Sequence, residues 1–335
     1  MLKFAIIGIG GLGKGHYRNM LELVKTRGDI EITALCDIEY SRFTEQTFTN
    51  LDSNSYQYDF DKFRLYNDYN EMLEKEKLDC VIIALPTYLH AQAAVTALNK
   101  GLHVFSEKPM ARTAEQCQNM IDRAKENKKL LMIGQCLRYW PEYVQLKEYI
   151  DSREFGNVIR AAFSRFNTIP RWSWQNWMQD FDKSGGAPLD LHIHDVDFIN
   201  WAFGRPISVT SYSTNKKFKF ESIHTTYKYN DILVQSSCDW GLAKSYSFSF
   251  TFLVNFEKAT VEMKDNIFKV YPEEGDAYSP ELKKESAYKK EIIDFIDCIK
   301  ENRQLTVVTP ESAKLSVEIV LQEMNSARTG AEVYI

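Results

Sequence analysis

The sequence lacks several features that would place a protein in a special class. It contains six cysteines in 335 residues, and no two of them lie in a C-x-x-C spacing. This usage favours a reducing compartment over a disulfide scaffold. No apolar run approaches the roughly 20 residues of a membrane-spanning helix. Internal repeats, low-complexity tracts and long runs of one charge are also missing from the sequence.

A strong net charge is lacking as well. The formal net charge is −5, so the chain has no field that would attract nucleic acid or an anionic membrane, and we expect neither partner. The first residues enter an apolar strand without the basic and small-residue regions of a secretory leader, which predicts a cytoplasmic protein. Hydrophobic residues at 44% and charged residues at 26% are typical of a globular chain, and the length suggests two domains.

Up to Ile133, short apolar runs alternate with helical stretches. The expected strands are Phe4–Ile7, Glu31–Leu35, Asp79–Leu85, Leu102–Phe105 and Leu130–Ile133, and the expected helices are Leu12–Thr26, His90–Lys100 and Thr113–Lys128. The stretch from Phe43 to Tyr69 is weakly patterned, with a strand expected only near Phe63–Leu65. Continuous apolar strands between helices predict an α/β fold with a doubly wound parallel sheet.

The pattern changes after Ile133. Helices are expected at Pro141–Ser152, Leu189–Phe203, Lys283–Glu301 and Pro310–Arg328, and five or six β-rich runs lie between Ile207 and Tyr271. Alternation such as that of Tyr246, Phe248, Phe250 and Phe252 predicts an antiparallel or mixed sheet with one face on a core. We therefore expect a boundary near Gly134–Tyr139, with domains at 1–133 and 134–335.

The first predicted strand leads into a glycine motif, Gly8-Ile9-Gly10-Gly11-Leu12-Gly13, which matches G-x-G-x-x-G and opens a helix. Gly8 permits the tight turn, Gly10 lets the backbone approach a pyrophosphate, and Gly13 lets helix and strand pack closely. The backbone N–H groups of Gly11 and Leu12, at the helix N-terminus, are offered to the phosphates. In this context the motif predicts a dinucleotide-binding domain of the Rossmann type.

Asp37 follows the second predicted strand. Its carboxylate can accept hydrogen bonds from the adenosine ribose and would repel a 2′-phosphate, and Ile38 rather than an arginine comes next. The sequence therefore favours NAD as the cofactor, while Arg42 keeps NADP open.

Two further motifs suggest chemistry. The first is Glu107-Lys108-Pro109, and the second is the run from Gly185 to Asp195, Gly-Gly-Ala-Pro-Leu-Asp-Leu-His-Ile-His-Asp. Together with the glycine motif, the segment Ala84–His90 and the segment Leu137–Tyr143, they resemble the glucose–fructose oxidoreductase/inositol dehydrogenase/MocA family over nearly the whole chain.

The resemblance implies a Rossmann domain followed by an α/β domain with an open, mainly antiparallel sheet. It implies catalytic roles for three residues, namely Lys108, Asp190 and His194. It also implies that the cofactor contacts a second set of residues, namely Pro86, Thr87, His90, Glu107 and Lys108. For His90, a structural role is an open alternative to contact with the nicotinamide ribose. Because the family's open sheet commonly buries its outer face against a partner, a homodimer or homotetramer is expected.

Physical reasoning supports the catalytic roles independently. Oxidation of an alcohol by hydride transfer needs a base for the hydroxyl proton, and histidine titrates near neutral pH. Asp190 and His194 would share one helix face, and Lys108 would follow a parallel strand, where ligands of doubly wound sheets bind. We interpret His194 as the acid/base, Lys108 as its aid and Asp190 as an orienting group. Whether Lys108 or His194 takes the proton stays open.

Further residues are candidates for binding substrate, alongside Lys108, Asp190 and His194. Arg138 can hold an anion or pair with an acidic neighbour, and Tyr139 follows it. Trp174, within Pro170–Trp177, can line a sugar or polyol pocket, or belong to a hydrophobic plug or subunit contact.

The remaining histidines are expected to have supporting roles. We expect His16 to be structural or to lie near the pyrophosphate. We expect His192 to be structural or to support the site from behind. We predict no metal there, because His192 and His194 diverge on a helix.

The sequence thus predicts an NAD(P)-dependent oxidoreductase acting on CH–OH groups of a sugar, polyol or related small molecule. Two alternatives stay open. One is a lyase or hydrolase of the same fold that recycles NAD in place. The other is a non-catalytic NAD(H)-binding sensor.

Overall fold

The computed structural model describes residues 1–44 and 58–335, which form two compact units. The first unit comprises Met1–Ala111, Glu115–Gly134 and Tyr288–Pro310. The second comprises Arg112–Ala114, Gln135–Ala287 and Glu311–Ile335. The weakly patterned stretch from Phe43 to Tyr69 includes residues 45–57, which lie outside the described residues.

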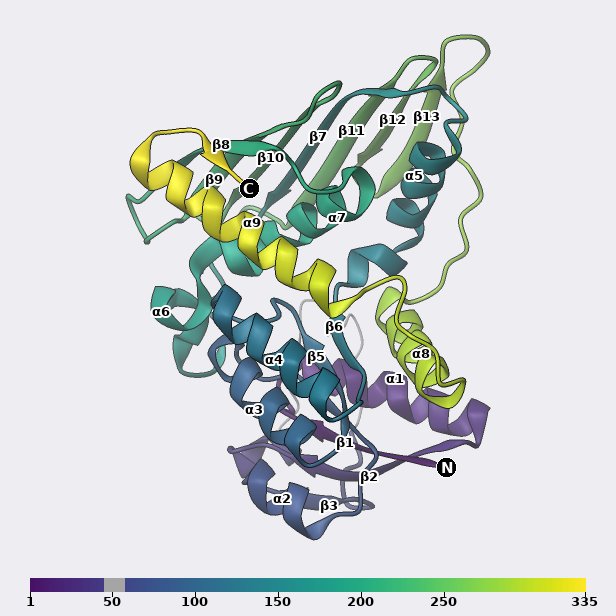
Figure 1. Cartoon of the computed structure of the whole chain (residues 1–335), viewed down its shortest axis with the longest axis vertical. Coiled ribbons are helices and arrows are strands. Elements are labelled where there is room, and N and C mark those ends of the chain that lie inside the picture. Colours follow the sequence, from purple (N-terminus) through teal and green to yellow (C-terminus); the bar gives the residue numbers. More distant parts are fainter. Residues whose placement is uncertain (45–57) are drawn as a thin grey trace. The chain divides into compact units, whose positions relative to one another are not determined.

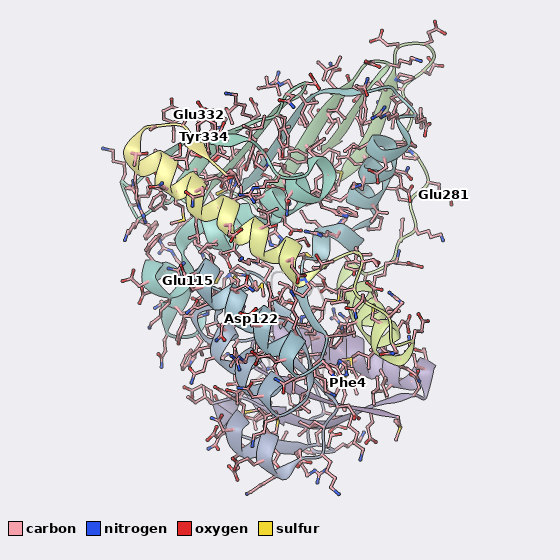
Figure 2. All side chains as sticks on the ribbon, viewed as in Figure 1. Phe4, Glu115, Asp122, Glu281, Glu332 and Tyr334 are labelled. Atoms are coloured by element: carbon pink, nitrogen blue, oxygen red, sulfur yellow. The ribbon has the colours of Figure 1, made fainter. Side chains whose placement is uncertain are left out.

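The first unit is built on a six-stranded parallel sheet with the strand order β3-β2-β1-β4-β5-β6. Its strands are β1 Leu2–Ile7, β2 Ile30–Cys36, β3 Arg64–Tyr66, β4 Cys80–Ile83, β5 His103–Glu107 and β6 Leu131–Gly134. The predicted doubly wound sheet is confirmed. Phe4 in β1, labelled in Figure 2, is fully buried, as are all four residues of β4, which is typical of a sheet covered on both faces. Strand order reverses between β1 and β4, which is where sheets of this kind bind ligands.

Among the residues that the structure describes, six helical segments accompany this sheet. They are α1 Gly11–Arg27, the short helix η1 Tyr40–Phe43, α2 Tyr69–Lys75, α3 Thr87–Asn99, α4 Ala114–Glu126 and α8 Ala287–Lys300. The pattern did not predict α2, although Asp68 caps it by accepting the backbone N–H of Asn70 at 2.8 Å.

Helix α8 lies beside α1 although the two are far apart in the sequence (Figure 1). Ion pairs join them: Lys289 to Glu22 at 3.0 Å and Arg27 to Asp297 at 2.6 Å. The predicted second domain, 134–335, therefore differs from the observed division, because Tyr288–Pro310 belongs to the first unit.

The second unit contains an eight-stranded sheet with the order β13-β12-β11-β7-β10-β9-β8-β14. Its strands are β7 Val158–Phe166, β8 Ser208–Thr214, β9 Ser222–Lys228, β10 Leu233–Asp239, β11 Ser249–Phe256, β12 Ala259–Lys264, β13 Ile267–Pro272 and β14 Val333–Tyr334. Only the β7–β10 pair is parallel, so the expected mainly antiparallel sheet is confirmed. Strand β7 was not predicted, since Arg160 and Arg165 interrupt its apolar pattern. The edge strand β14 carries Tyr334, labelled in Figure 2.

Helices cover one face of this second sheet (Figure 1). The helical segments of the unit are η2 Cys136–Tyr139, α5 Pro141–Ser152, η3 Trp174–Gln179, α6 Phe181–Ser184, the π-helical η4 Pro188–His192, α7 Ile193–Phe203 and α9 Pro310–Thr329. Segment α7 contacts β7, and η4 contacts β9 and β10. Apolar side chains such as Leu253 and Ile267 remain exposed on the unit's surface, at 38% and 58%.

Among the described residues, we find no helix that combines the length and apolar character needed to cross a membrane.

The turn from β1 to α1 leaves no room for side chains at two glycines. Gly8 has a φ of +92°, and a Cβ there would lie 2.5 Å from the Ala84 carbonyl oxygen. A Cβ on Gly13 would lie 1.8 Å from the Gly8 carbonyl oxygen. The close packing of helix and strand predicted for this motif is therefore confirmed. At both glycines the atoms that a side chain would meet first belong to the backbone, which cannot shift as a flexible side chain can.

We expect Gly13→Ala to lower the free energy of unfolding by about 3 kcal/mol or more, in the tail of point-mutant effects. The control is Gly15→Ala, because a Cβ on Gly15 in the same helix meets nothing within 4 Å. This control should raise stability by about 0.5–1 kcal/mol through helix propensity. Urea unfolding of the two variants checks both values, and a tolerated Gly13→Ala would contradict the packing argument.

Candidate active site

The glycine turn presents an unobstructed backbone at the carboxyl end of β1. Gly10 is the N-cap of α1, and a Cβ added to it would meet nothing within 4 Å. Because glycine has no side chain to cap the helix, the first amides of α1, including those of Gly11 and Leu12, are left for another acceptor. This local arrangement fits a pyrophosphate, as the motif predicted.

Asp37 follows β2 and is tied to the same turn. Its Oδ2 accepts the Ile9 backbone N–H at 2.7 Å, and its Oδ1 accepts that of Glu39 at 2.9 Å. Burial raises the pKa of Asp37 against these two hydrogen bonds and the nearby charge of Arg42. Its carboxylate is thus oriented beside the glycine turn, as a ribose-binding group should be. Ile38 next to it is 69% exposed.

His90, predicted to contact the cofactor, is buried and bonded to backbone. Its Nδ1 lies 2.8 Å from the Pro109 carbonyl oxygen and its Nε2 lies 2.7 Å from that of Leu85. Burial lowers the pKa of His90, while these two contacts oppose the shift. The imidazole therefore joins the loop after β4 to the turn after β5, and both ring nitrogens are occupied without a cofactor.

Pro86 and Thr87 form the start of α3 in this loop. Pro86 is the N-cap, and its carbonyl oxygen accepts the Leu89 backbone N–H at 2.9 Å. Thr87 is 2% exposed, so its side chain packs within the unit.

Lys108 follows the last residue of β5 and is partly exposed, whereas Glu107 and Pro109 on either side are buried. The Glu107 carboxylate turns inward: its Oε1 accepts a hydrogen bond from His16 Nε2 at 2.6 Å. The Glu107 side chain is 3% exposed and bonded within the protein, and its cofactor contact stays a prediction. The contact between His16 and Glu107 was not anticipated.

In the second unit, Asp190 and His194 are partly exposed while the residues between them are buried. Asp190 lies in the π-helical η4, whose last turn is closed by the Ile193 N–H to the Pro188 carbonyl, and His194 lies in the first turn of α7. Both side chains therefore share the accessible side of this helix, as their spacing predicted. The wider π turn was not predicted; such turns recur at functional sites.

His192 points the other way and is fully buried. Its Nε2 lies 3.2 Å from Glu323 Oε2 on α9 and 3.4 Å from the Tyr227 hydroxyl on β9. Burial opposes a charged ring, but the Glu323 carboxylate and the Cys238 thiol outweigh it and raise the pKa of His192 to about 10. The expected supporting role of His192 is what the structure gives it.

The acidic residues after His194 are bonded to arginines. Arg165 donates from Nη2 to Asp195 Oδ1 at 2.9 Å. Arg138 donates from Nε and Nη2 to the two oxygens of Asp197, each at 2.8 Å, and from Nη1 to Ser312 at 3.0 Å. Of the two roles predicted for Arg138, the structure supports pairing with an acidic neighbour, and the side chain is 3% exposed. Its substrate contact stays a prediction.

The other predicted substrate residues differ in exposure. Tyr139 is 8% exposed at the end of η2. Trp174 is partly exposed at the start of η3, while Trp172 is 65% exposed. The tryptophan run is therefore largely a surface feature within its own unit.

The chain matches two family models. Residues 2–135 match "Oxidoreductase family, NAD-binding Rossmann fold", and residues 143–262 match "GFO/IDH/MocA C-terminal domain".

Named relatives agree with these matches. The chain is 34% identical over 207 residues to the inositol 2-dehydrogenase of Salmonella typhimurium, covering 60% of this chain and 54% of that protein. It thus spans about half the length of that relative. It is also 25% identical to the scyllo-inositol 2-dehydrogenase (NAD(+)) of Bacillus subtilis, covering 100% of this chain and 96% of the relative.

Among solved structures, the aldose–aldose oxidoreductase from Caulobacter crescentus superimposes with a TM-score of 0.84 at 17% identity. The match covers 100% of this chain and 99% of that one. The fold is therefore shared over the whole chain.

We expect the His192–Glu323 pair to make stability pH-dependent. The folded pKa of His192, about 10, exceeds the ordinary value of 6.5, so the pair's contribution is complete below pH 6.5 and is lost as pH rises through 10. Relative to His192→Gln, the wild type should lose up to about 1.4 kcal/mol of unfolding free energy per pH unit in that window.

Urea unfolding between neutral pH and pH 9.5 measures this difference. His224→Gln is the control, because the pKa of His224 is lowered by burial and by the charge of His192, so its difference from wild type should stay flat above neutral pH. A flat difference for His192→Gln as well would mean that His192 is not charged in the folded protein.

Proposed function

The chain belongs to the GFO/IDH/MocA oxidoreductase family, and from this premise we propose that it is an NAD(P)-dependent oxidoreductase acting on CH–OH groups of a sugar, polyol or related molecule. The observation that carries the proposal is in the first unit. Adjacent strands β1, β4 and β5 end at the same edge of the sheet, with the glycine turn after β1 and a partly exposed lysine after β5. A cofactor-binding backbone and a group suited to a substrate oxygen thus share one edge.

The chemistry that we propose uses three side chains. A bound nicotinamide supplies the hydride acceptor. Lys108 donates a hydrogen bond to the substrate oxygen and stabilises developing alkoxide charge. His194 receives the hydroxyl proton, and Asp190, on the same accessible side of its helix, orients the substrate or the imidazole. The partial exposure of all three residues supports these roles.

We propose NAD rather than NADP as the preferred cofactor. Asp37 is held beside the glycine turn by two backbone hydrogen bonds, and its carboxylate would repel a 2′-phosphate. The scyllo-inositol 2-dehydrogenase of Bacillus subtilis is named for NAD(+) and fits this choice, although a D-xylose 1-dehydrogenase from Hypocrea jecorina is named for NADP(+).

We further propose a homodimer or homotetramer in the cytoplasm. The second unit leaves Ile159, Leu253 and Ile267 exposed on strands β7, β11 and β13, and a partner copy covering them would remove apolar surface from water. All six cysteines are buried and none forms a disulfide, which fits a reducing compartment.

A substrate panel with NAD⁺ and NADP⁺ tests the function. We expect net NADH formation with a polyol or aldose, and a kcat/KM for NAD⁺ at least about tenfold above that for NADP⁺, a difference of 1.4 kcal/mol. Inositols and D-xylose belong in the panel because relatives carry their names. Product formation without net NADH would favour an NAD-recycling lyase or hydrolase. Tight NADH binding without turnover of any compound would favour a sensor.

Lys108→Ala should lower kcat/KM by about 100- to 1,000-fold, because it removes a group that stabilises charge developing on the substrate oxygen. NADH affinity, measured by fluorescence titration, should fall much less than kcat/KM, because the glycine turn that binds the pyrophosphate is untouched. Lys62→Ala serves as the matched control, since Lys62 is a 76% exposed lysine of the same unit. Unchanged turnover in Lys108→Ala would remove Lys108 from the mechanism.

A further inference from the structure

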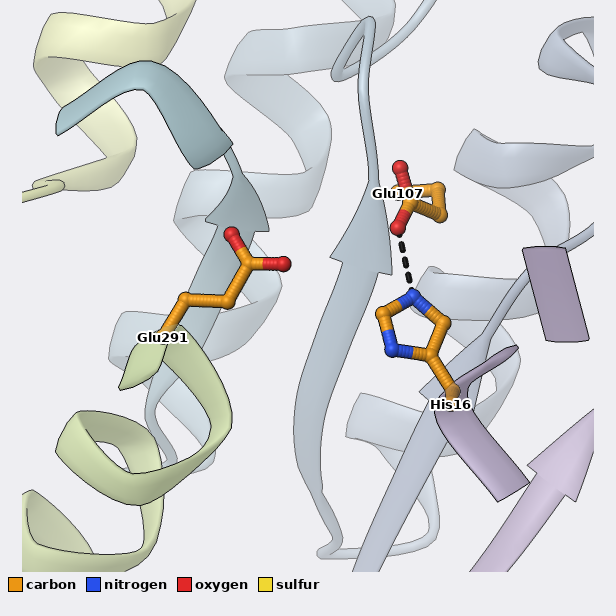
Figure 3. A group of neighbouring side chains, drawn as sticks. All are labelled: His16, Glu107 and Glu291. Carbon is orange, nitrogen blue, oxygen red and sulfur yellow. Dashed lines mark hydrogen bonds and ion pairs between the residues drawn. The ribbon is translucent and has the colours of Figure 1, made fainter. Parts of the chain in front are cut away.

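Three ionisable side chains from distant parts of the chain meet inside the first unit (Figure 3). His16 comes from α1, Glu107 from the end of β5 and Glu291 from α8. They are 1%, 3% and 0% exposed, and one nitrogen or oxygen of each lies within 4.8 Å of the others. The chemistry proposed above uses none of the three directly.

Glu107 is held at both carboxylate oxygens. Oε1 accepts from His16 Nε2 at 2.6 Å, and Oε2 accepts the backbone N–H of Lys108 at 3.2 Å. Gly134 on the neighbouring strand β6 leaves space for this carboxylate, since a Cβ there would lie 3.3 Å from Oε1. The carboxylate is therefore a fixed link between α1 and the backbone that carries Lys108.

The other end of the cluster offers a complementary pair of groups. Within the described residues, neither oxygen of Glu291 has a hydrogen-bond partner, nor does Nδ1 of His16. Burial and the neighbouring Glu107 raise the pKa of Glu291 well above its usual range, so its carboxyl carries a proton and can donate it. When His16 donates from Nε2 as a neutral ring, its Nδ1 is an acceptor. Glu291 thus has a hydrogen to donate, and His16 has a place to receive it, directly or through one water.

We propose that His16 and Glu291 are positioning residues for the turn that carries Lys108. The protonated Glu291 donates toward His16 Nδ1, His16 Nε2–H donates to Glu107, and the Glu107 carboxylate holds the Lys108 amide. In this series of hydrogen bonds, each donor faces a group that can accept. His90 anchors the same turn from the other side through the Pro109 carbonyl. The proposal rests on the proposed function only in taking Lys108 as the group that meets substrate.

A divalent cation is the competing occupant of the cluster, because one histidine and two carboxylates can bind a metal. The 2.6 Å separation of His16 Nε2 and Glu107 Oε1 favours the proton, since it is the length of a strong hydrogen bond. Two ligands at about 2.1 Å from one metal, at the angles usual for zinc, would stand farther apart than this.

Glu291→Gln and Glu291→Leu separate these accounts. The amide of glutamine keeps a donor, so Glu291→Gln should retain kcat and the slow exchange of the Lys108 amide. Leucine has no donor, so Glu291→Leu should lower kcat about 10- to 100-fold, the effect of a displaced catalytic group. NADH affinity should stay within about threefold, because the glycine turn is untouched. Hydrogen exchange measured by mass spectrometry over residues 107–110 should become faster in Glu291→Leu alone.

Ile292→Val controls for weakened packing of α8, because Ile292 is fully buried next to Glu291 and bears no polar group. Equal loss of kcat and amide protection in Ile292→Val and Glu291→Leu, or no change in Glu291→Leu, would overturn the proposal. One equivalent of zinc, manganese or magnesium in the purified wild type, lost in Glu291→Gln, would establish a metal site instead. Because exchange at residues 107–110 needs no substrate, it tests the positioning role even if no compound in the panel is turned over.

Discussion

The hydrogen bond between His16 and Glu107 connects the parts of the first unit on which its proposed chemistry depends. Helix α1 begins at the glycine turn, and β5 ends beside Lys108, so this contact ties the cofactor-binding end of the helix to the lysine's backbone. A charge-assisted hydrogen bond between buried side chains is strong and directional. Helix α8 belongs to the same unit: Glu291 lies in the cluster with His16 and Glu107, and the ring centroids of Phe295 and Phe105 lie 6.0 Å apart. A segment late in the sequence therefore supports a site that is encoded early.

The second unit uses buried ion pairs in a similar way. Three residues on the inner side of the helix that carries Asp190 and His194 are paired with other elements: His192 with α9, Asp195 with β7 and Asp197 with η2. Buried pairs of this kind add little net stability, since desolvation offsets their attraction. These pairs fix the orientation of the helix, because a helix held at three charged residues cannot rotate without leaving a charge unpaired. Asp190 and His194 are thereby kept on the accessible side.

Much of the fold followed from periodicity. The parallel strands and their helices were predictable because a doubly buried strand is continuously apolar, and α5 was predicted at its observed bounds. Strand β7 was not predicted because Arg165 lies inward, where it pairs with Asp195. No local sequence pattern reveals this pairing. The buried partners did leave one signal. Glu291 occupies the same helical stripe as Ala287 and Phe295, and Glu323 lies on the stripe of Ile319 and Val320, so each carboxylate interrupts a buried face.

The sequence by itself determined the dinucleotide turn, the sheet that bears it and the position of Lys108 at a strand end. These depend on the spacing of residues close together in the chain and on the steric demands of single glycines. Only the tertiary structure decided that Glu107 faces His16, that Arg138 pairs with Asp197, and that His192 lies against Glu323. A buried charged group needs a partner of opposite charge or a hydrogen bond. When that partner is distant in the sequence, it is identified only once the helices and strands have packed.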